Sequence, residues 1–130
     1  MSLKDLALKK IEYDAGGGRE IFLSFKRKKD DMLASFLRLR LPGDNSSGWG
    51  ILEDAALIRE LHTYGRLAEI GNEGRQSQHR GFGKQLLNNA ENIAKKAGYK
   101  KIAIISGIGV RAYYRKLGYR LSGTYMVKAL

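Results

Sequence analysis

The first half of the chain alternates between apolar and polar positions with a period of two, which is typical of β-strands with one buried face. Residues 7–14 form the first such run, and a glycine-rich turn over 15–19 follows it. Two further runs, 21–25 and 33–41, flank a charged loop. Together they predict an antiparallel hairpin.

A fourth alternating run, over 55–64, carries polar side chains that are unusual for a central strand. One face would present Leu57, Arg59, Leu61 and Thr63, and the other would present Ile58, Glu60, His62 and Tyr64. Gly65 interrupts the run before it continues over 66–70, and a glycine inside a strand pattern often marks a bulge or a splay. We therefore expect the sheet to splay near Gly65.

The second half of the chain begins with helical periodicity. Apolar residues recur at helical spacing between polar ones, at Leu86, Leu87, Ala90, Ile93, Ala94 and Ala97. We expect this helix to start at Gly81, opposite the splay, and to end at Gly98.

Short elements close the chain. Residues 100–105 are apolar on both faces, which predicts a strand in the middle of the sheet. After a turn at 107–109, residues 110–117 have helical spacing, and two short strands follow over 119–121 and 124–128. This order of elements predicts an α/β (α+β) fold, with a mixed and mostly antiparallel sheet and flanking helices.

A chain of 130 residues with 43% apolar content suits one compact domain over residues 1–130. It has no cysteine and only two histidines, His62 and His79, which argues against disulfides, iron–sulfur clusters and metal sites. No stretch approaches the roughly 20 apolar residues of a membrane span, and no signal peptide is recognisable. We therefore expect a cytoplasmic protein without a membrane partner.

The formal net charge of +11 adds a candidate partner, because such a surface attracts polyanions and repels small cationic amines. The basic residues gather in two places, at Lys26, Arg27, Lys28 and Lys29 and at Arg111, Arg115, Lys116 and Arg120. This clustering favours contacts to nucleic-acid phosphates. The alternative is a solvated basic surface with no specific partner.

The stretch at the start of the long helix is spaced by glycines and consists of Gln78, His79, Arg80, Gly81, Phe82, Gly83 and Lys84. The first N–H groups of a helix have no intrahelical partner and favour an anion, and glycines let the anion approach. An ordinary turn before a core helix is the alternative. The spacing matches neither the dinucleotide fingerprint nor the Walker loop.

The Q-x-x-G-x-G spacing, at the start of a helix that follows a strand, resembles the pyrophosphate-binding signature of the GNAT acetyltransferases. More of the chain looks like the acetyltransferase domain of the Elongator catalytic subunit, in segments that read RELHTYG from 59, QHRGFGKQLL from 78, ISGIGVR from 105 and YYRKLGY from 113. Residues 20–40 extend the resemblance to most of the chain.

The resemblance implies a GNAT fold that binds acetyl-CoA. Backbone amides in the stretch 78–84 would hold the diphosphate, and Leu67 and Ala68 would offer their backbone to the pantetheine or acetyl group. In that family the domain follows a radical S-adenosylmethionine domain with an iron–sulfur cluster, and the two together modify the wobble uridine of tRNA. That partner domain has no counterpart in these residues. The implied function is therefore to bind acetyl-CoA and to cleave its thioester, which supplies the acetyl group for the tRNA.

Thioester cleavage needs donors at the developing oxyanion and an acid for the departing thiolate. Related GNAT enzymes place a tyrosine four residues before a glycine such as Gly118, so the resemblance assigns the acid to Tyr114, with Tyr113 as its competitor. Packing between helix and sheet is the alternative for each. Glu60 and His62 share a strand face, and either could act as a base or orient a substrate through water, unless they form a hydrogen-bonded structural pair.

Two other functions stay open. The chain has Gly107, Ile108 and Gly109 where an asparagine is common in the superfamily, and Ala112 where many relatives have a polar residue. Both departures argue against a standard amine-acetylating site. A protein lysine (histone-type) N-acetyltransferase is nevertheless the second hypothesis. A tRNA-binding module with a GNAT fold and no turnover is the third, against which the Q-x-x-G-x-G stretch argues.

Overall fold

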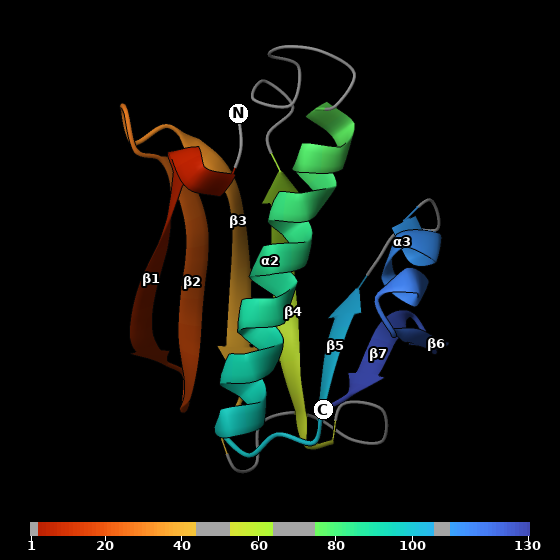
Figure 1. The fold of residues 1–130 in the computed structure, drawn as a ribbon. Helices are drawn as coiled ribbons and strands as arrows, with labels where there is room; N and C mark the ends of the chain where they lie inside the picture. Colours follow the sequence, from red (N-terminus) through yellow and green to blue (C-terminus); the bar gives the residue numbers. More distant parts are fainter. Residues whose placement is uncertain (1–2, 44–52, 64–74, 106–109) are drawn as a thin grey trace.

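The computed structural model of the chain describes residues 3–43, 53–63, 75–105 and 110–130 (Figure 1). A short 3₁₀-helix, η1 (Leu3–Asp5), precedes the sheet. The strands are β1 (Leu6–Ala15), β2 (Gly18–Arg27), β3 (Leu33–Leu41), β4 (Ala55–Thr63), β5 (Lys101–Ile105), β6 (Arg120–Ser122) and β7 (Tyr125–Ala129). The longer helices are α2 (Arg75–Lys96) and α3 (Arg111–Lys116).

The described strands form one sheet in the order β1-β2-β3-β4-β5-β7-β6. Neighbours run antiparallel except for β4 and β5, which are parallel and are connected through α2. α2 packs along the middle of the sheet, from β2 to β5, and α3 packs on β6 and β7 (Figure 1). This arrangement confirms the predicted mixed, mostly antiparallel sheet with flanking helices.

The buried core lies between the sheet and α2. On β2, Ile21, Leu23 and Phe25 alternate into it, as the period of two predicts, and Leu86 and Leu87 meet them from α2. Each such side chain contributes about 1.5–3 kcal/mol when it is fully buried. The apolar stripe of α2 therefore fixes the helix on the sheet.

The strands β4 and β5 separate part-way along the sheet. Residues 55–58 of β4 pair with 101–104 of β5, whereas β4 continues to Thr63 against β3 alone (Figure 1). The pairing of β4 with β5 therefore ends at Ile58. The sequence analysis placed the splay near Gly65, which lies outside the described residues.

A β-bulge in β4 begins this splay. Ile58 and Glu60 pair with adjacent residues of β3, so Arg59 between them has no partner in the register. A bulge moves every later side chain to the other face of the strand, which brings Leu61 to the core side with Ile58. The prediction that Ile58 and Leu61 lie on opposite faces is wrong, because register against β3 overrides the alternation of β4 alone.

The long helix starts earlier than predicted. α2 begins at Arg75 rather than at Gly81, so all of residues 78–84 are helical. The prediction that the residues before Gly81 form a turn ahead of the helix is wrong. The arginine and glutamine residues upstream favour a helix, and its propagation tolerates glycines that each cost about 1 kcal/mol. At the other end the prediction holds, because Gly98 has a φ of +96° and donates to the Lys95 carbonyl at 3.1 Å.

Candidate functional site

The unpaired edge of β4 is the first part of the candidate site. From Arg59 to Thr63 this strand has β3 on one side and no described strand on the other. A neighbouring strand pairs with about half of the backbone N–H and C=O groups of a strand. An edge without such a neighbour therefore leaves the other half available to a ligand. Leu67 and Ala68, the predicted backbone contacts, lie outside the described residues.

The start of α2 is the second part. Inside a helix the amides after the first turn donate to carbonyls four residues earlier, so in α2 the unpaired N–H groups belong to the turn that begins at Arg75. The amides from His79 to Lys84 are therefore not free as predicted. A side chain on Gly81 would meet nothing within 4 Å, whereas Phe82 is buried and its ring lies 6.3 Å from that of Phe25. The side chains of Gln78, His79 and Arg80 lie outside the described residues.

Glu60 and His62 lie together on the face of the sheet opposite the core. His62 Nε2 is 3.8 Å from Glu60 Oε2, and the His62 ring lies 5.1 Å from that of Phe36. Arg38 on β3 donates to Glu60 Oε1. Because Arg38 holds this carboxylate, Glu60 is better placed to orient a substrate or His62 than to take a proton alone.

Tyr114 and Tyr113 on α3 form an aromatic cluster with Tyr119. The Tyr114 ring meets that of Tyr113 edge-on at 5.3 Å and that of Tyr119 at 5.7 Å. Tyr114 is buried in the core, and Tyr113 is partly exposed at its border. Burial, and secondarily Tyr113, raises the pKa of Tyr114 to about 12. The phenol therefore keeps its proton across the physiological range, and the same shift makes it a weaker acid than an exposed tyrosine.

The first basic cluster is divided by an ion pair. Arg27 donates to both carboxylate oxygens of Asp30, from Nε at 2.9 Å and from Nη2 at 2.5 Å. This hydrogen bond, more than that from the Met32 amide, lowers the pKa of Asp30 to about 2. Lys28 and Lys29 are exposed beside it. A cavity of about 360 Å³ here is lined by Lys4, Asp5, Arg27, Lys28 and Lys29. The sequence analysis missed Lys4, which η1 brings to this loop.

The second basic cluster is spread over several elements. Arg115 and Lys116 are exposed on α3, and the Nε of Arg111 is buried without a hydrogen-bond partner among the residues that the structure describes. Arg120 lies instead in a cavity of about 530 Å³ that also has Lys100, Lys101 and Lys128 in its lining. The sequence analysis missed these lysines. The strand order β5-β7-β6 brings them to Arg120, and no local pattern shows it.

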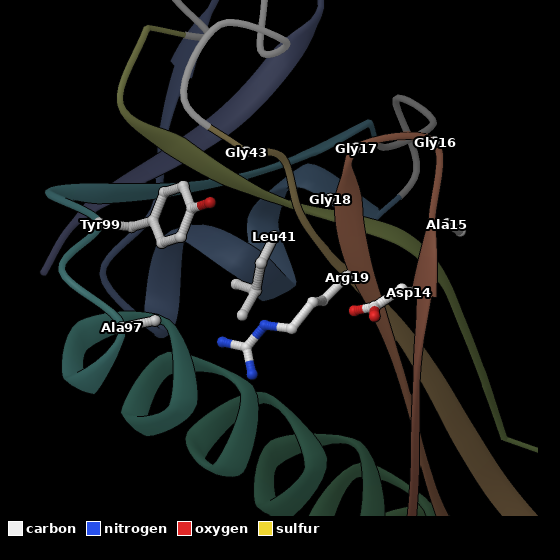
Figure 2. Close-up of a pocket in the computed structure, with 10 residues that line it drawn as sticks. All are labelled: Asp14, Ala15, Gly16, Gly17, Gly18, Arg19, Leu41, Gly43, Ala97 and Tyr99. Carbon is white, nitrogen blue, oxygen red and sulfur yellow. The ribbon is translucent and has the colours of Figure 1, made fainter.

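Another cavity, of about 580 Å³, lies away from the predicted site (Figure 2). It is bounded by the β1–β2 turn at Gly16–Gly18, the end of β3 and Tyr99, with the side chains of Arg19 and Tyr99 reaching into the space. Ala97 marks its floor and lies roughly 24 Å along the helix from Gly81 at 1.5 Å per residue. No predicted site residue lines it.

Two expected absences concern only the part of the chain that the structure describes. There, no three potential ligands among His, Cys, Asp and Glu come together as a metal site. No described helix has the length and apolar character to span a membrane.

The geometry now has a family context. Residues 7–119 match the acetyltransferase (GNAT) family, and the chain belongs to that family. The tRNA uridine(34) acetyltransferase of Methanocaldococcus jannaschii is 45% identical over 98% of this chain and 24% of its own length. Elongator complex protein 3 of Bos taurus is 44% identical over 92% of this chain and 22% of its own. The predicted resemblance is thereby confirmed.

The fold has a counterpart in a solved structure. The Elp3 protein of the archaeon Methanocaldococcus infernus, with residues 1–46 deleted, superposes with a TM-score of 0.79 at 44% identity, over 98% of this chain and 30% of that one. The chain thus spans about a quarter of the length of the curated relatives and less than a third of this structure.

The residues present fit acetyl-CoA. The open edge of β4 could hold part of the ligand by its backbone, the open side of Gly81 leaves room for a phosphate, and Tyr114 is a protonated phenol. The fit requires the unpaired N–H groups to be those of the first turn of α2, upstream of the amides predicted from sequence.

Proposed function

We propose that residues 1–130 act as one acetyl-CoA-binding acyltransferase domain, which cleaves the thioester to supply an acetyl group for modification of the tRNA wobble uridine. Membership of the GNAT family supports the cofactor. The name of the Methanocaldococcus jannaschii relative supports the tRNA substrate. The observation that carries the proposal is the open edge of β4, which ends its pairing with β5 at Ile58 while α2 lies alongside.

The parts of the site have separate tasks. Backbone N–H groups of the first turn of α2, from Arg75 to Gln78, hold the diphosphate beside the open side of Gly81. Leu67 and Ala68 hold the pantetheine or acetyl group. Bound acetyl-CoA supplies an activated acyl group. Tyr114 would supply the phenolic proton for the departing thiolate sulfur, while the acetyl carbon forms its new bond to the acceptor or to water. Glu60 and His62 would orient that acceptor on the opposite face of the sheet.

The partners follow from the relatives. The chain matches only about a quarter of their length. We propose that it works beside the radical S-adenosylmethionine domain that the family resemblance implies, and that the two together modify the wobble uridine. The exposed lysines around Lys28 and Lys100 contact tRNA phosphates without reading sequence.

A second candidate, a tRNA-binding module without turnover, is favoured by one observation. The amides from His79 to Lys84 are engaged within α2, which leaves a smaller anion site than the sequence predicted. The experiment below separates the two candidates, because a binding module cleaves no thioester.

The test is release of free coenzyme A thiol from acetyl-CoA, with and without tRNA, by the wild-type chain and two variants. Gly81→Asp adds a negative charge where the phosphate would lie. The affinity for acetyl-CoA is expected to fall by about 10- to 100-fold, because the displaced phosphate would lose hydrogen bonds that contribute roughly 1.5–3 kcal/mol each. Gly81→Ala is the matched control, and it should bind as the wild type because a Cβ there meets nothing within 4 Å. Equal acetyl-CoA affinity of folded Gly81→Asp and Gly81→Ala would contradict the phosphate site.

A further inference from the structure

A buried polar contact joins α2 to the segment that follows α3. The Tyr119 hydroxyl donates a 2.8 Å hydrogen bond to Oε2 of Glu91 on α2, and Lys128 Nζ on β7 donates a 3.1 Å bond to Oε1. Lys128 also lies over the Tyr119 ring, 5.7 Å from its centroid. Tyr119 is 1% exposed and the Glu91 side chain 14%. Both oxygens of a largely buried carboxylate therefore have a donor, as such a group requires.

Tyr119 fixes Tyr114 in two ways. The Tyr119 amide donates to the Tyr114 carbonyl at 3.0 Å. The two rings meet edge to face, with centroids 5.7 Å apart and planes at 65°. A change in the position of the Tyr119 ring therefore moves both the backbone and the ring of Tyr114.

α3 has few means of fixing its own orientation. It is six residues long, and its N-cap, Val110, makes no side-chain hydrogen bond. A helix this short is unstable alone and takes its place from tertiary contacts. Its buried residue is Tyr114. Besides the shared apolar core, the hydrogen bond of Tyr119 to Glu91 relates the Tyr114 cluster to α2, the helix whose first turn would hold the cofactor.

We propose that Glu91 positions Tyr114 for thioester cleavage, acting through Tyr119 and supported by Lys128. This inference rests on the proposed function, in which Tyr114 protonates the departing sulfur. Tyr114 touches the reacting atoms, and Glu91 and Tyr119 act only through it, so they are positioning residues. One rigid helix then carries both the cofactor contacts, around Gly81, and the group that sets the distance of the acid.

The test compares variants that remove the Tyr119 hydroxyl or the Glu91 carboxylate from this contact. Tyr119→Phe deletes the hydroxyl and keeps the ring, so kcat of acetyl-CoA cleavage should fall by about 10- to 100-fold with KM unchanged, as for a misplaced catalytic group. Glu91→Ala should do the same, and Glu91→Gln, which keeps an acceptor for Tyr119, should recover part of the rate. Tyr13→Phe, at a tyrosine that is 48% exposed on β1, is the matched control and should leave both constants unchanged.

A spectroscopic readout makes the result independent of turnover. In protein with isotopically labelled tyrosine, the ring resonances of Tyr114 should shift in Tyr119→Phe and Glu91→Ala and stay in place in Tyr13→Phe. Unshifted Tyr114 resonances in folded Tyr119→Phe and Glu91→Ala would overturn the inference. A wild-type chain that cleaves no acetyl-CoA would overturn the proposed function instead, while the resonances still decide whether Glu91 sets the position of Tyr114.

Discussion

Replacing Tyr114 by phenylalanine is expected to lower the rate of thioester cleavage by about 10²–10⁴-fold, the usual cost of losing a positioned proton donor. Phenylalanine keeps the packing against Tyr119, so the fold and the affinity for acetyl-CoA should remain. Tyr113→Phe is the matched control, because Tyr113 adjoins the same cluster at its exposed border, and its loss should cost much less. Initial rates of thiol release at saturating acetyl-CoA measure the difference.

The pH profile gives a second check on Tyr114. Since its pKa is raised to about 12, the phenol remains protonated well above the ordinary value of 10.0. The rate should therefore not fall through pH 10 from loss of this acid. The same shift makes the folded chain bind more protons than the unfolded chain between about pH 10 and 12, so stability declines as the pH rises through that window. The rates of the wild type and of Tyr114→Phe should therefore be compared below about pH 10, where this loss of stability has not begun. A Tyr114→Phe variant with the wild-type rate would show that Tyr114 only fills the core.

Removing basic residues of the first basic cluster and of the cavity around Arg120 is expected to flatten the salt dependence of tRNA binding. Log affinity falls linearly with log salt, and each lost phosphate contact reduces the slope by about 0.7–0.9. Lys28→Ala with Lys29→Ala should therefore reduce it by about 1.4–1.8, and Lys100→Ala with Arg120→Ala by a similar amount. Combining all four substitutions should reduce the slope by about 2.8–3.6, and the affinities for different RNAs should fall by similar factors.

Arg27→Ala is the matched control for this series. Asp30 accepts both hydrogen bonds that Arg27 makes there, so its charge is largely neutralised within the loop. Its removal should change the slope less than removal of Lys28 alone. Titrations of one tRNA over a salt series decide the point. Equal slopes in the wild type and the quadruple variant would show that these four basic residues contact solvent and not tRNA phosphates.

The strands could be predicted from sequence because alternation is a local property. Residues 21–25 and 33–41 show their buried faces directly, and the hairpin follows. The bulge at Arg59 could not be predicted, since it exists only in the register of β4 against β3. For the same reason, the faces of β4 were assigned correctly to Glu60 and His62 but not to Ile58.

Only some positions of the candidate site residues could be predicted from sequence, and their roles remain proposals. Tyr114 is buried and Tyr113 lies at the border, as their spacing on one helix allows. The start of α2 was misplaced because glycine marks turns more often than it interrupts helices, yet a favourable neighbourhood extends the helix through it. The contacts of Glu91 with Tyr119 and Lys128 span 28 and 37 residues, so no local pattern contains them.

The central claim is that acetyl-CoA binds between the open edge of β4 and the start of α2. The most direct measurement is a titration of isotopically labelled protein with acetyl-CoA, followed through its backbone amide resonances. Saturable shifts are predicted along β4 beyond Arg59 and in the first turns of α2, with the amides of Gly16, Gly17 and Tyr99 at the 580 Å³ cavity unchanged. Absence of saturable shifts, or shifts centred on that cavity, would contradict the account.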